Sequence, residues 1–164
     1  AQDEIAGAWS EVKSASNYQL IVKARSLDHL IGSARAGALI LQKNYSQAIS
    51  EIEEVLASGS VPPASGELLL LRADRSLCLA ASGDKQKADD QIVAVDACGL
   101  TGLGPDDAAL ISLSLAQASS LLGDGDSANR YLESARTKFD DHQKNIESLM
   151  ARIARFSNPL SITG

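Results

Sequence analysis

The sequence is poor in aromatic residues and in signs of β-structure. Phe, Trp and Tyr make up 4% of the 164 residues, although hydrophobic residues as a group make up 45%. Such a core must be built from Ala, Leu, Ile and Val, which pack closely spaced helices well and large cavities poorly. Stretches of alternating polar and apolar residues, which would indicate strands, are nearly absent. We therefore expect an all-α fold.

The chain also lacks an excess of positive charge. Its formal net charge is −6, whereas a nucleic-acid partner or an anionic membrane surface calls for a basic patch. No stretch of the sequence reaches the roughly 18 uninterrupted apolar residues that cross a bilayer. These features predict a soluble, acidic protein with neither nucleic-acid binding nor membrane insertion.

Patterns that carry catalysis or metal binding are missing as well. The two histidines, His29 and His142, lie far apart in the sequence, and no Cys/His/Asp spacing is typical of a zinc site. The glycine-rich segment 99–104 follows a predicted helix and has no Lys-Ser or Lys-Thr after it, so it does not match a phosphate-binding loop. We predict no enzymatic activity, no metal and no cofactor.

The two cysteines, Cys78 and Cys98, fall on the two helices of one predicted hairpin whose turn lies near Gly83. The helical rise separates them by about 8–10 Å, which exceeds the reach of a disulfide. We expect two free, small, buried thiols. They do not distinguish a cytoplasmic from a periplasmic protein.

Segments of the chain resemble one another at a spacing of about 40 residues. Alanines that recur at this spacing are Ala8, Ala48, Ala88 and Ala128. In each segment an apolar residue follows four positions later and another three positions after that, which is one face of an α-helix. A preceding helix repeats too, with Leu30, Leu70 and Leu110 at the same spacing.

Turn-forming residues divide these segments into helical hairpins. Gly83-Asp84 and Gly123-Asp124 lie between the two helices of a unit, and Lys43-Asn44 takes the same place in the first unit. Glycine ends a helix in the left-handed conformation, and the Asp or Asn that follows can cap the next helix. Loops rich in Gly, Pro and Ser at 58–66 and 99–105 separate the units.

The whole chain, 1–164, is therefore predicted to be one domain, a right-handed α-solenoid of stacked antiparallel helical hairpins. Hairpins are expected at 27–58, 67–98 and 107–139, after the second helix of a partial unit at 1–16. Residues 140–157 are expected to form a C-terminal capping helix, with one apolar and one charged face. The apolar face comprises Ile146, Leu149, Met150, Ile153 and Phe156. The incomplete first unit favours a chain cut from a longer protein, and a lone starting helix that packs on the stack is the alternative.

Two short patterns carry a resemblance to a known family. Tyr45-x-x-Ala48-x-x-x-Ile52 resembles the second helix of a tetratricopeptide repeat, and the Gly-x-x-x-x-Ala patterns at 83–88 and 123–128 resemble its turn and small residue. The resemblance covers about three units. The period of about 40 residues departs from the family's 34, and the aromatic signature of the first helix is missing. Arginines stand where the family has bulky apolar residues, namely Arg35, Arg72 and Arg75.

The resemblance to this family implies a function in binding, because its first helices line a concave groove that holds a partner peptide or helix. Transferred by position, the groove candidates are Leu30, Leu70, Ala73, Leu77, Leu110, Leu113 and Gln117. This set lacks the Lys, Asn and Arg with which the chaperone-binding branch of the family clamps a carboxylate. An apolar groove instead suits an amphipathic helix. The alternative interpretation, that these residues are ordinary core between helices, stays open.

The leading hypothesis is a non-catalytic scaffold or adaptor for protein–protein interaction, which binds a helix or extended segment of another protein. One alternative is a regulatory or assembly module of a larger bacterial envelope, secretion or motility protein. Another is a small secretion-type chaperone. The open N-terminal end is also compatible with a homo-oligomer.

Overall fold

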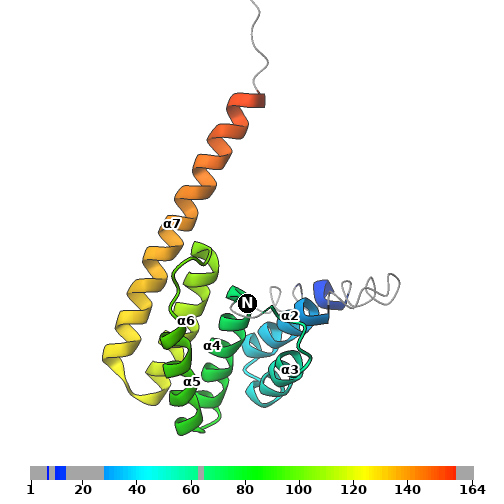
Figure 1. Ribbon diagram of the computed structural model, residues 1–164, viewed down its shortest axis with the longest axis vertical. Coiled ribbons are helices and arrows are strands. Elements are labelled where there is room, and N and C mark those ends of the chain that lie inside the picture. Colours follow the sequence, from blue (N-terminus) through cyan, green and yellow to red (C-terminus); the bar gives the residue numbers. More distant parts are fainter. Residues whose placement is uncertain (1–6, 8–9, 14–27, 63–64, 158–164) are drawn as a thin grey trace, which may run out of the picture.

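The computed structural model describes residues 7, 10–13, 28–62 and 65–157, and the helices account for most of them (Figure 1). The helices are α2 (Asp28–Leu41), α3 (Tyr45–Ala57), α4 (Gly66–Ala81), α5 (Lys85–Cys98), α6 (Pro105–Leu122) and α7 (Gly125–Ser157). No strand occurs in these described ranges. The expected all-α class is confirmed.

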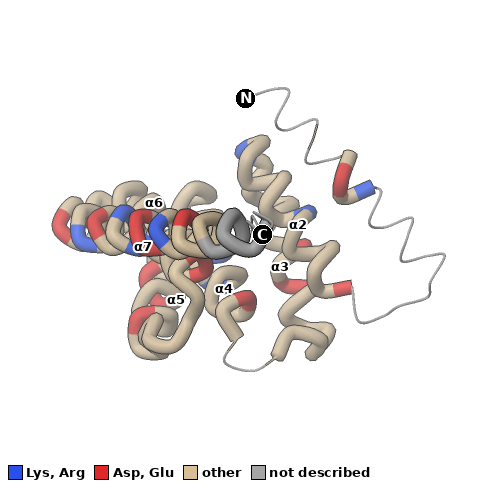
Figure 2. The backbone as a smooth tube through the Cα atoms, turned by 90° about the horizontal axis from the view of Figure 1, so that it is seen from above, with Lys and Arg blue, Asp and Glu red and all other residues tan. Residues whose placement is uncertain are grey.

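Consecutive helices pack as pairs along the chain. α2 packs on α3, α4 on α5 and α6 on α7, and the pairs meet chiefly where α4 contacts α6 and where α3 contacts α4. Figure 1 shows the pairs following one another across the molecule, from α2 and α3 on one side to α7 on the other. Seen from above in Figure 2, α7 runs along α6, with acidic and basic residues along its length.

The first helix of each later pair begins with a recognisable cap. The Ser65 hydroxyl accepts the backbone N–H of Leu68 at 3.1 Å, which satisfies one of the free donors at the start of α4. Pro105 opens α6, where its missing N–H costs nothing, and Asp106 and Asp107 place negative charge in the first turn. These local signals fix where α4 and α6 start, and thus how the two helices align.

Three helix–turn–helix corners share one hydrogen-bond arrangement. The backbone N–H of Asn44, Asp84 and Asp124 donates to the carbonyl five residues earlier, at 2.9, 3.0 and 3.0 Å. The residue before each has a positive φ, which is how a helix ends in a left-handed residue. These residues are Lys43 (59°), Gly83 (87°) and Gly123 (85°). The first corner therefore holds a lysine in a conformation that favours glycine.

Replacing Lys43 by glycine is expected to raise the free energy of unfolding by about 1 kcal/mol, because glycine adopts a positive φ without a Cβ clash. Urea unfolding followed by circular dichroism measures the change. The reciprocal variant Gly83→Lys, at a φ of 87°, should lose a comparable amount. A Lys43→Gly variant no more stable than the wild type would contradict this assignment of strain.

The main core lies where α4, α5, α6 and α7 meet. Ile111 and Val95 are fully buried there, and Leu115 is 1% exposed. Ala48 and Ala88, two of the alanines that recur in the sequence, are also fully buried. Their small side chains allow the second helix of a pair to approach the first closely.

Residues 140–157, the expected C-terminal capping helix, are the second half of one long helix. α7 is one helix of 33 residues, because neither Gly nor Pro interrupts the sequence between Gly125 and Ser157. Its partner α6 has 18 residues, so nearly half of α7 extends past the start of α6, as Figure 1 shows. Ile146, Leu149 and Met150 are exposed on this extension. This segment therefore does not cover the core.

The expectation of buried thiols is correct for one cysteine and wrong for the other. Both are free, but Cys78 is buried on α4 whereas Cys98 is exposed at the last position of α5. The final turn of a helix has fewer neighbours than its middle, which explains the difference.

Most of the predicted partial unit at 1–16, including the open N-terminal end, lies outside the described residues. Residues 7 and 10–13 are helical, and Val12 is buried. Within the described part of the chain, no helix has both the length and the apolar character needed to cross a membrane.

Candidate functional site

An apolar groove of 640 Å³ lies where the C-terminal part of α2 and α6 faces α4 and the start of α7. Two large hydrophobic side chains on its lining are open to solvent, Leu41 at 60% and Leu121 at 50% exposure. Leu77 and Ala116 also line the groove but are each 6% exposed. The groove is thus an exposed continuation of the main core.

Helix ends position the two exposed leucines. Leu41 is the last residue of α2, and Leu121 lies one residue before the end of α6. Because a corner follows each of them, no further turn of the same helix packs over these side chains. Tyr45 at the start of α3 and Leu132 on α7 complete the apolar lining.

The groove carries little charge. Among its lining residues only Lys43 is ionised, and Gln117, Ser120 and Asn129 supply neutral polar groups. Covering such a lining removes apolar surface from water, worth about 25 cal/mol per Å² before the costs of association. Covering the groove does not require the desolvation of several charged groups. This chemistry suits an apolar segment with an acidic group near Lys43.

The structure brings three of the seven predicted site residues to the groove: Leu77, Leu113 and Gln117. They follow the expected first-helix positions of α4 and α6. Leu113 and Gln117 are four residues apart and so lie on one face of α6.

The other four predicted residues lie elsewhere. Ala73 is fully buried in the main core, so its assignment to an open groove is wrong. Leu70 is partly buried and packs against the same core. Leu30 and Leu110 are 50% and 41% exposed but are not part of the lining. The seven predicted groove residues are therefore distributed among the core, the groove and the open surface.

Sequence reasoning missed the residues that make the groove open, above all Leu41 and Leu121. A signal existed, because both occupy the last turn of a helix just before a polar corner. Their exposure depends on how far the neighbouring helices extend.

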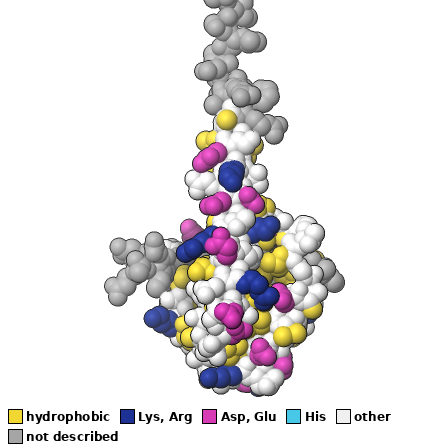
Figure 3. All heavy atoms as spheres, turned by 90° about the vertical axis from the view of Figure 1, so that its left-hand side faces the viewer, with side chains coloured by type: hydrophobic (Ala, Val, Ile, Leu, Met, Phe, Trp, Pro, Cys, Tyr) yellow, Lys and Arg dark blue, Asp and Glu magenta, His cyan; other side chains and the backbone are white. Residues whose placement is uncertain are grey.

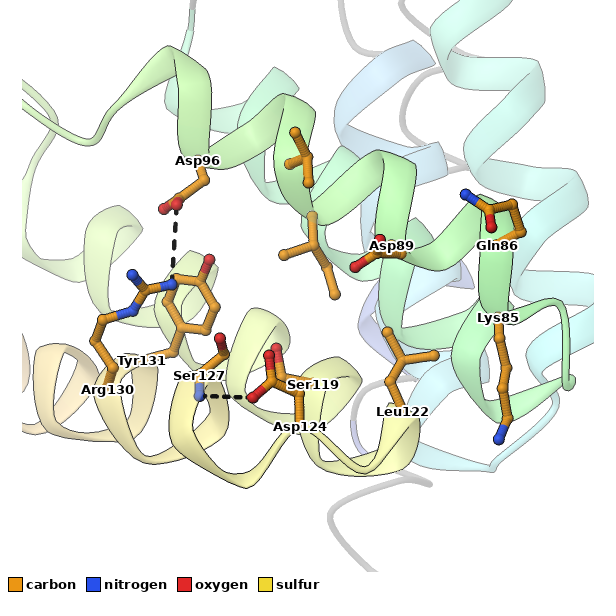
Figure 4. Close-up of a pocket in the computed structure, with 12 residues that line it drawn as sticks. Lys85, Gln86, Asp89, Asp96, Ser119, Leu122, Asp124, Ser127, Arg130 and Tyr131 are labelled. Atoms are coloured by element: carbon orange, nitrogen blue, oxygen red, sulfur yellow. Dashed lines mark hydrogen bonds and ion pairs between the residues drawn. The ribbon is translucent and has the colours of Figure 1, made fainter.

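A second pocket, of 510 Å³, lies between α5 and α7 and is polar (Figure 4). Arg130 stands 3.9 Å from Asp96 and 4.8 Å from the ring centroid of Tyr131. Burial, followed by the charge of Asp96, raises the pKa of the Tyr131 phenol. In Figure 4, Lys85 lies at the opposite end from Arg130, so the charged groups do not converge on one point. This pocket carries no recognisable acid–base arrangement.

A carboxyl group is held between α4 and α6. The Ser114 hydroxyl donates to Asp74 Oδ1 at 2.6 Å. Burial raises the pKa of Asp74 to about 6, and the hydrogen bond from Ser114 opposes part of this rise. Burial, and then the charge of Asp74, raise the pKa of the nearby Cys78 thiol to about 12. Cys78 is therefore a weak nucleophile at neutral pH.

Comparison with protein-family models, with curated proteins and with solved structures gives no match to this chain. In the described residues, no group of three or more His, Cys, Asp or Glu side chains is arranged to hold a metal ion. The apolar groove is the candidate site, with Leu41 and Leu121 exposed on its lining.

Proposed function

We propose that this protein is a non-catalytic interaction module whose groove binds an amphipathic helix of another protein. The observation that carries the proposal is the pair of solvent-exposed leucines, Leu41 and Leu121, on the lining of an apolar groove. Exposed apolar patches of this kind are typical of protein–protein contacts. The partner helix would present apolar residues at positions i, i+3 or i+4, and i+7.

We further propose that the helix pairs form an α-solenoid similar to tetratricopeptide repeats. The three corners with the same hydrogen bonds, at a spacing of about 40 residues, support this arrangement. So does the stacking of α4 against α6, which are the first helices of two consecutive pairs. In such a stack the first helices form the binding side, and the groove is lined mainly by them.

The single lysine on the lining gives the proposed partner helix a direction. An acidic residue at the end of the helix that lies near Lys43 would gain a charge-assisted contact at the rim of the groove. The gain would appear mainly as specificity, because a rim contact stays accessible to water. An assembly module of a larger protein and a chaperone would both use the same groove, and the identity of the bound segment distinguishes them.

Site-specific photo-crosslinking in the native source tests this function. With a photoreactive residue in place of Leu121, we expect adducts to one apolar helical segment of one protein. The same residue in place of Val93, which is 61% exposed on α5 and outside the groove, is the matched control. The Leu41→Glu substitution should abolish the Leu121 adduct. Equal adducts from both positions, or an adduct that survives Leu41→Glu, would contradict binding in the groove.

A further inference from the structure

A small pocket of 220 Å³ lies between the second and third helix pairs. Helices α5, α6 and α7 line it together with the loop that follows α5. α5 contacts α6 far less than α4 or α7 does, and this looser contact leaves room for the pocket. We call it the inter-pair pocket. Its lining has no residue in common with that of the apolar groove, so the two are separate places on the molecule.

The inner walls of the inter-pair pocket are apolar and buried. Val95 on α5, Leu115 on α6 and Tyr131 on α7 belong to the main core, and each also lines the pocket. Leu100 in the loop is half-buried and completes the apolar lining. Contact with such walls removes apolar surface from water, and an aromatic side chain such as Tyr131 packs well against a second ring. The walls therefore favour a ligand with an apolar ring.

Two serine hydroxyls also line the pocket, and one of their two hydrogens has no acceptor. Ser112 on α6 is fully buried, and its Oγ lies 3.1 Å from the Oγ of Ser134 on α7. Each hydroxyl carries one hydrogen, and the bond between them uses only one of the two. Ser76, which is equally buried, donates instead to the Ala73 carbonyl of its own helix. In the described part of the chain neither Ser112 nor Ser134 has such a second partner, so the pair can donate to an oxygen in the pocket.

The rim of the pocket carries one charge of each sign. Asp96 and Arg130 line this pocket and also the polar pocket between α5 and α7, and Figure 4 marks their contact of 3.9 Å. Figure 3, which faces α7, shows acidic and basic side chains interspersed along that helix rather than gathered by sign. An ion of either sign at the rim would meet attraction from one group and repulsion from the other. The rim therefore favours a neutral ligand.

The volume of the pocket restricts the ligand to about one ring. An engineered apolar cavity of about 150 Å³ binds benzene. At 220 Å³ the inter-pair pocket holds a ring of that size with one or two small substituents. A ring with a single oxygen, such as p-cresol, combines an apolar body, an acceptor for the free serine hydrogen and the absence of charge.

We propose that the inter-pair pocket binds a small, neutral, single-ring aromatic molecule that carries an oxygen acceptor, such as a phenol. The ring lies against Leu115 and Tyr131, and its oxygen accepts the free hydrogen of the Ser112–Ser134 pair. Because the lining comes from both helix pairs, the bound molecule ties α5 to α6 and α7. This site acts beside the apolar groove and does not depend on what the groove binds.

Nuclear magnetic resonance titration of the chain with p-cresol tests the site. A ligand of this size should bind with a dissociation constant in the millimolar range. We expect saturable shifts of the backbone amides in the segments 95–100, 112–115 and 130–134, which contain the lining residues. Shifts centred on Leu41 and Leu121 instead would place p-cresol in the apolar groove and overturn the proposal.

Removing both hydroxyls tests the role assigned to the serine pair. The double variant Ser112→Ala/Ser134→Ala should weaken p-cresol binding by about fivefold, as expected for the loss of one neutral hydrogen bond. Toluene is the matched probe, because it has the same ring and methyl group without the oxygen. Its affinity should be unchanged or higher in the double variant. If both probes respond alike, the serine pair does not recognise the oxygen and the proposal fails.

Filling the pocket tests its location. Ser134 is half-buried, and the larger side chain of Ser134→Leu takes up part of the pocket volume. The affinity for p-cresol should then fall by about tenfold or more. The control Ser127→Leu places the same side chain two turns earlier on α7, on the lining of the polar pocket, and should leave the affinity within about twofold. Circular dichroism checks that both variants stay helical. An affinity that Ser134→Leu leaves unchanged would contradict binding in this pocket.

N-Acetyltyrosinamide distinguishes a free molecule from a tyrosine side chain of a partner protein. It carries the same phenol ring, with two amides in place of the adjoining peptide chain. The limited volume of the pocket should exclude the amides, so this compound should bind about tenfold more weakly than p-cresol. Equal affinity for the two compounds would assign the pocket to a tyrosine of a partner protein and overturn the proposal. The absence of saturable shifts with millimolar p-cresol would overturn it as well.

Discussion

Replacing Leu115 by alanine is expected to lower the free energy of unfolding by about 3 kcal/mol. Leu115 is 1% exposed in the main core, where α6 meets α4 and α7. Truncation removes buried methyl groups and leaves a cavity that closely packed helices cannot fully close. Urea unfolding followed by circular dichroism gives the difference from the change in midpoint.

Leu121→Ala, six residues further along α6, is the matched control. The same side chain is 50% exposed there, so its truncation should cost less than about 1 kcal/mol. Comparing the two substitutions distinguishes a core position from a groove position on the same helix. Equal losses of unfolding free energy at the two positions would show that Leu121 packs as core and would contradict an open groove.

Acidification should stabilise the protein through Asp74. Its pKa is about 6 in the folded protein, above the ordinary value of 3.8. The folded state therefore binds the proton more tightly, so stability from this group is greatest below pH 3.8 and falls as the pH rises through 6. The difference between the two limits is at most about 3 kcal/mol. Urea unfolding of the wild type and of Asp74→Asn, at pH 4.5 and pH 7.5, measures most of this difference.

The stability advantage of Asp74→Asn over the wild type should be about 2 kcal/mol larger at pH 7.5 than at pH 4.5, because the amide oxygen can still accept the Ser114 hydroxyl without carrying a charge. The control Asp89→Asn changes an exposed carboxyl and should follow the wild type at both values. If the advantage of Asp74→Asn does not grow with pH, the carboxylate is not held in an unfavourable site.

Local sequence signals predicted the helices and their corners well. Gly83 and Gly123 end α4 and α6 near the expected places, and the buried alanines Ala48 and Ala88 lie on the expected faces. These features depend on a few neighbouring residues, whose conformational preferences act wherever the chain folds. Lys43 ends α2 in the same way although it is not a glycine. Only its position in the spacing of about 40 residues suggested this role.

The length of α7 and the position of its apolar stripe were harder to predict. The spacing of Ile146 and Leu149 indicates an apolar face, but not what that face packs against. The sequence suggested that the stripe covers the end of the stack. In the structure α6 is too short for α7 to pack along its whole length, so the stripe projects beyond the body.

The groove could be predicted only in part, because an apolar side chain is compatible with core and with a binding surface alike. Ala73 and Leu77 lie four residues apart on α4, yet Ala73 is sealed in the core and Leu77 reaches the groove lining. The distance to the neighbouring helix decides between them. That distance depends on contacts between helices that are far apart in the sequence.

Binding in the groove can be measured most directly with a synthetic peptide of the segment that photo-crosslinking identifies. Calorimetric titration of the wild-type chain should give saturable binding, which Leu41→Glu and Leu121→Glu should each weaken by about 50-fold. Val93→Glu, equally exposed but outside the groove, should leave the affinity unchanged. Equal affinity for all four chains would contradict the proposal that the apolar groove is the binding site.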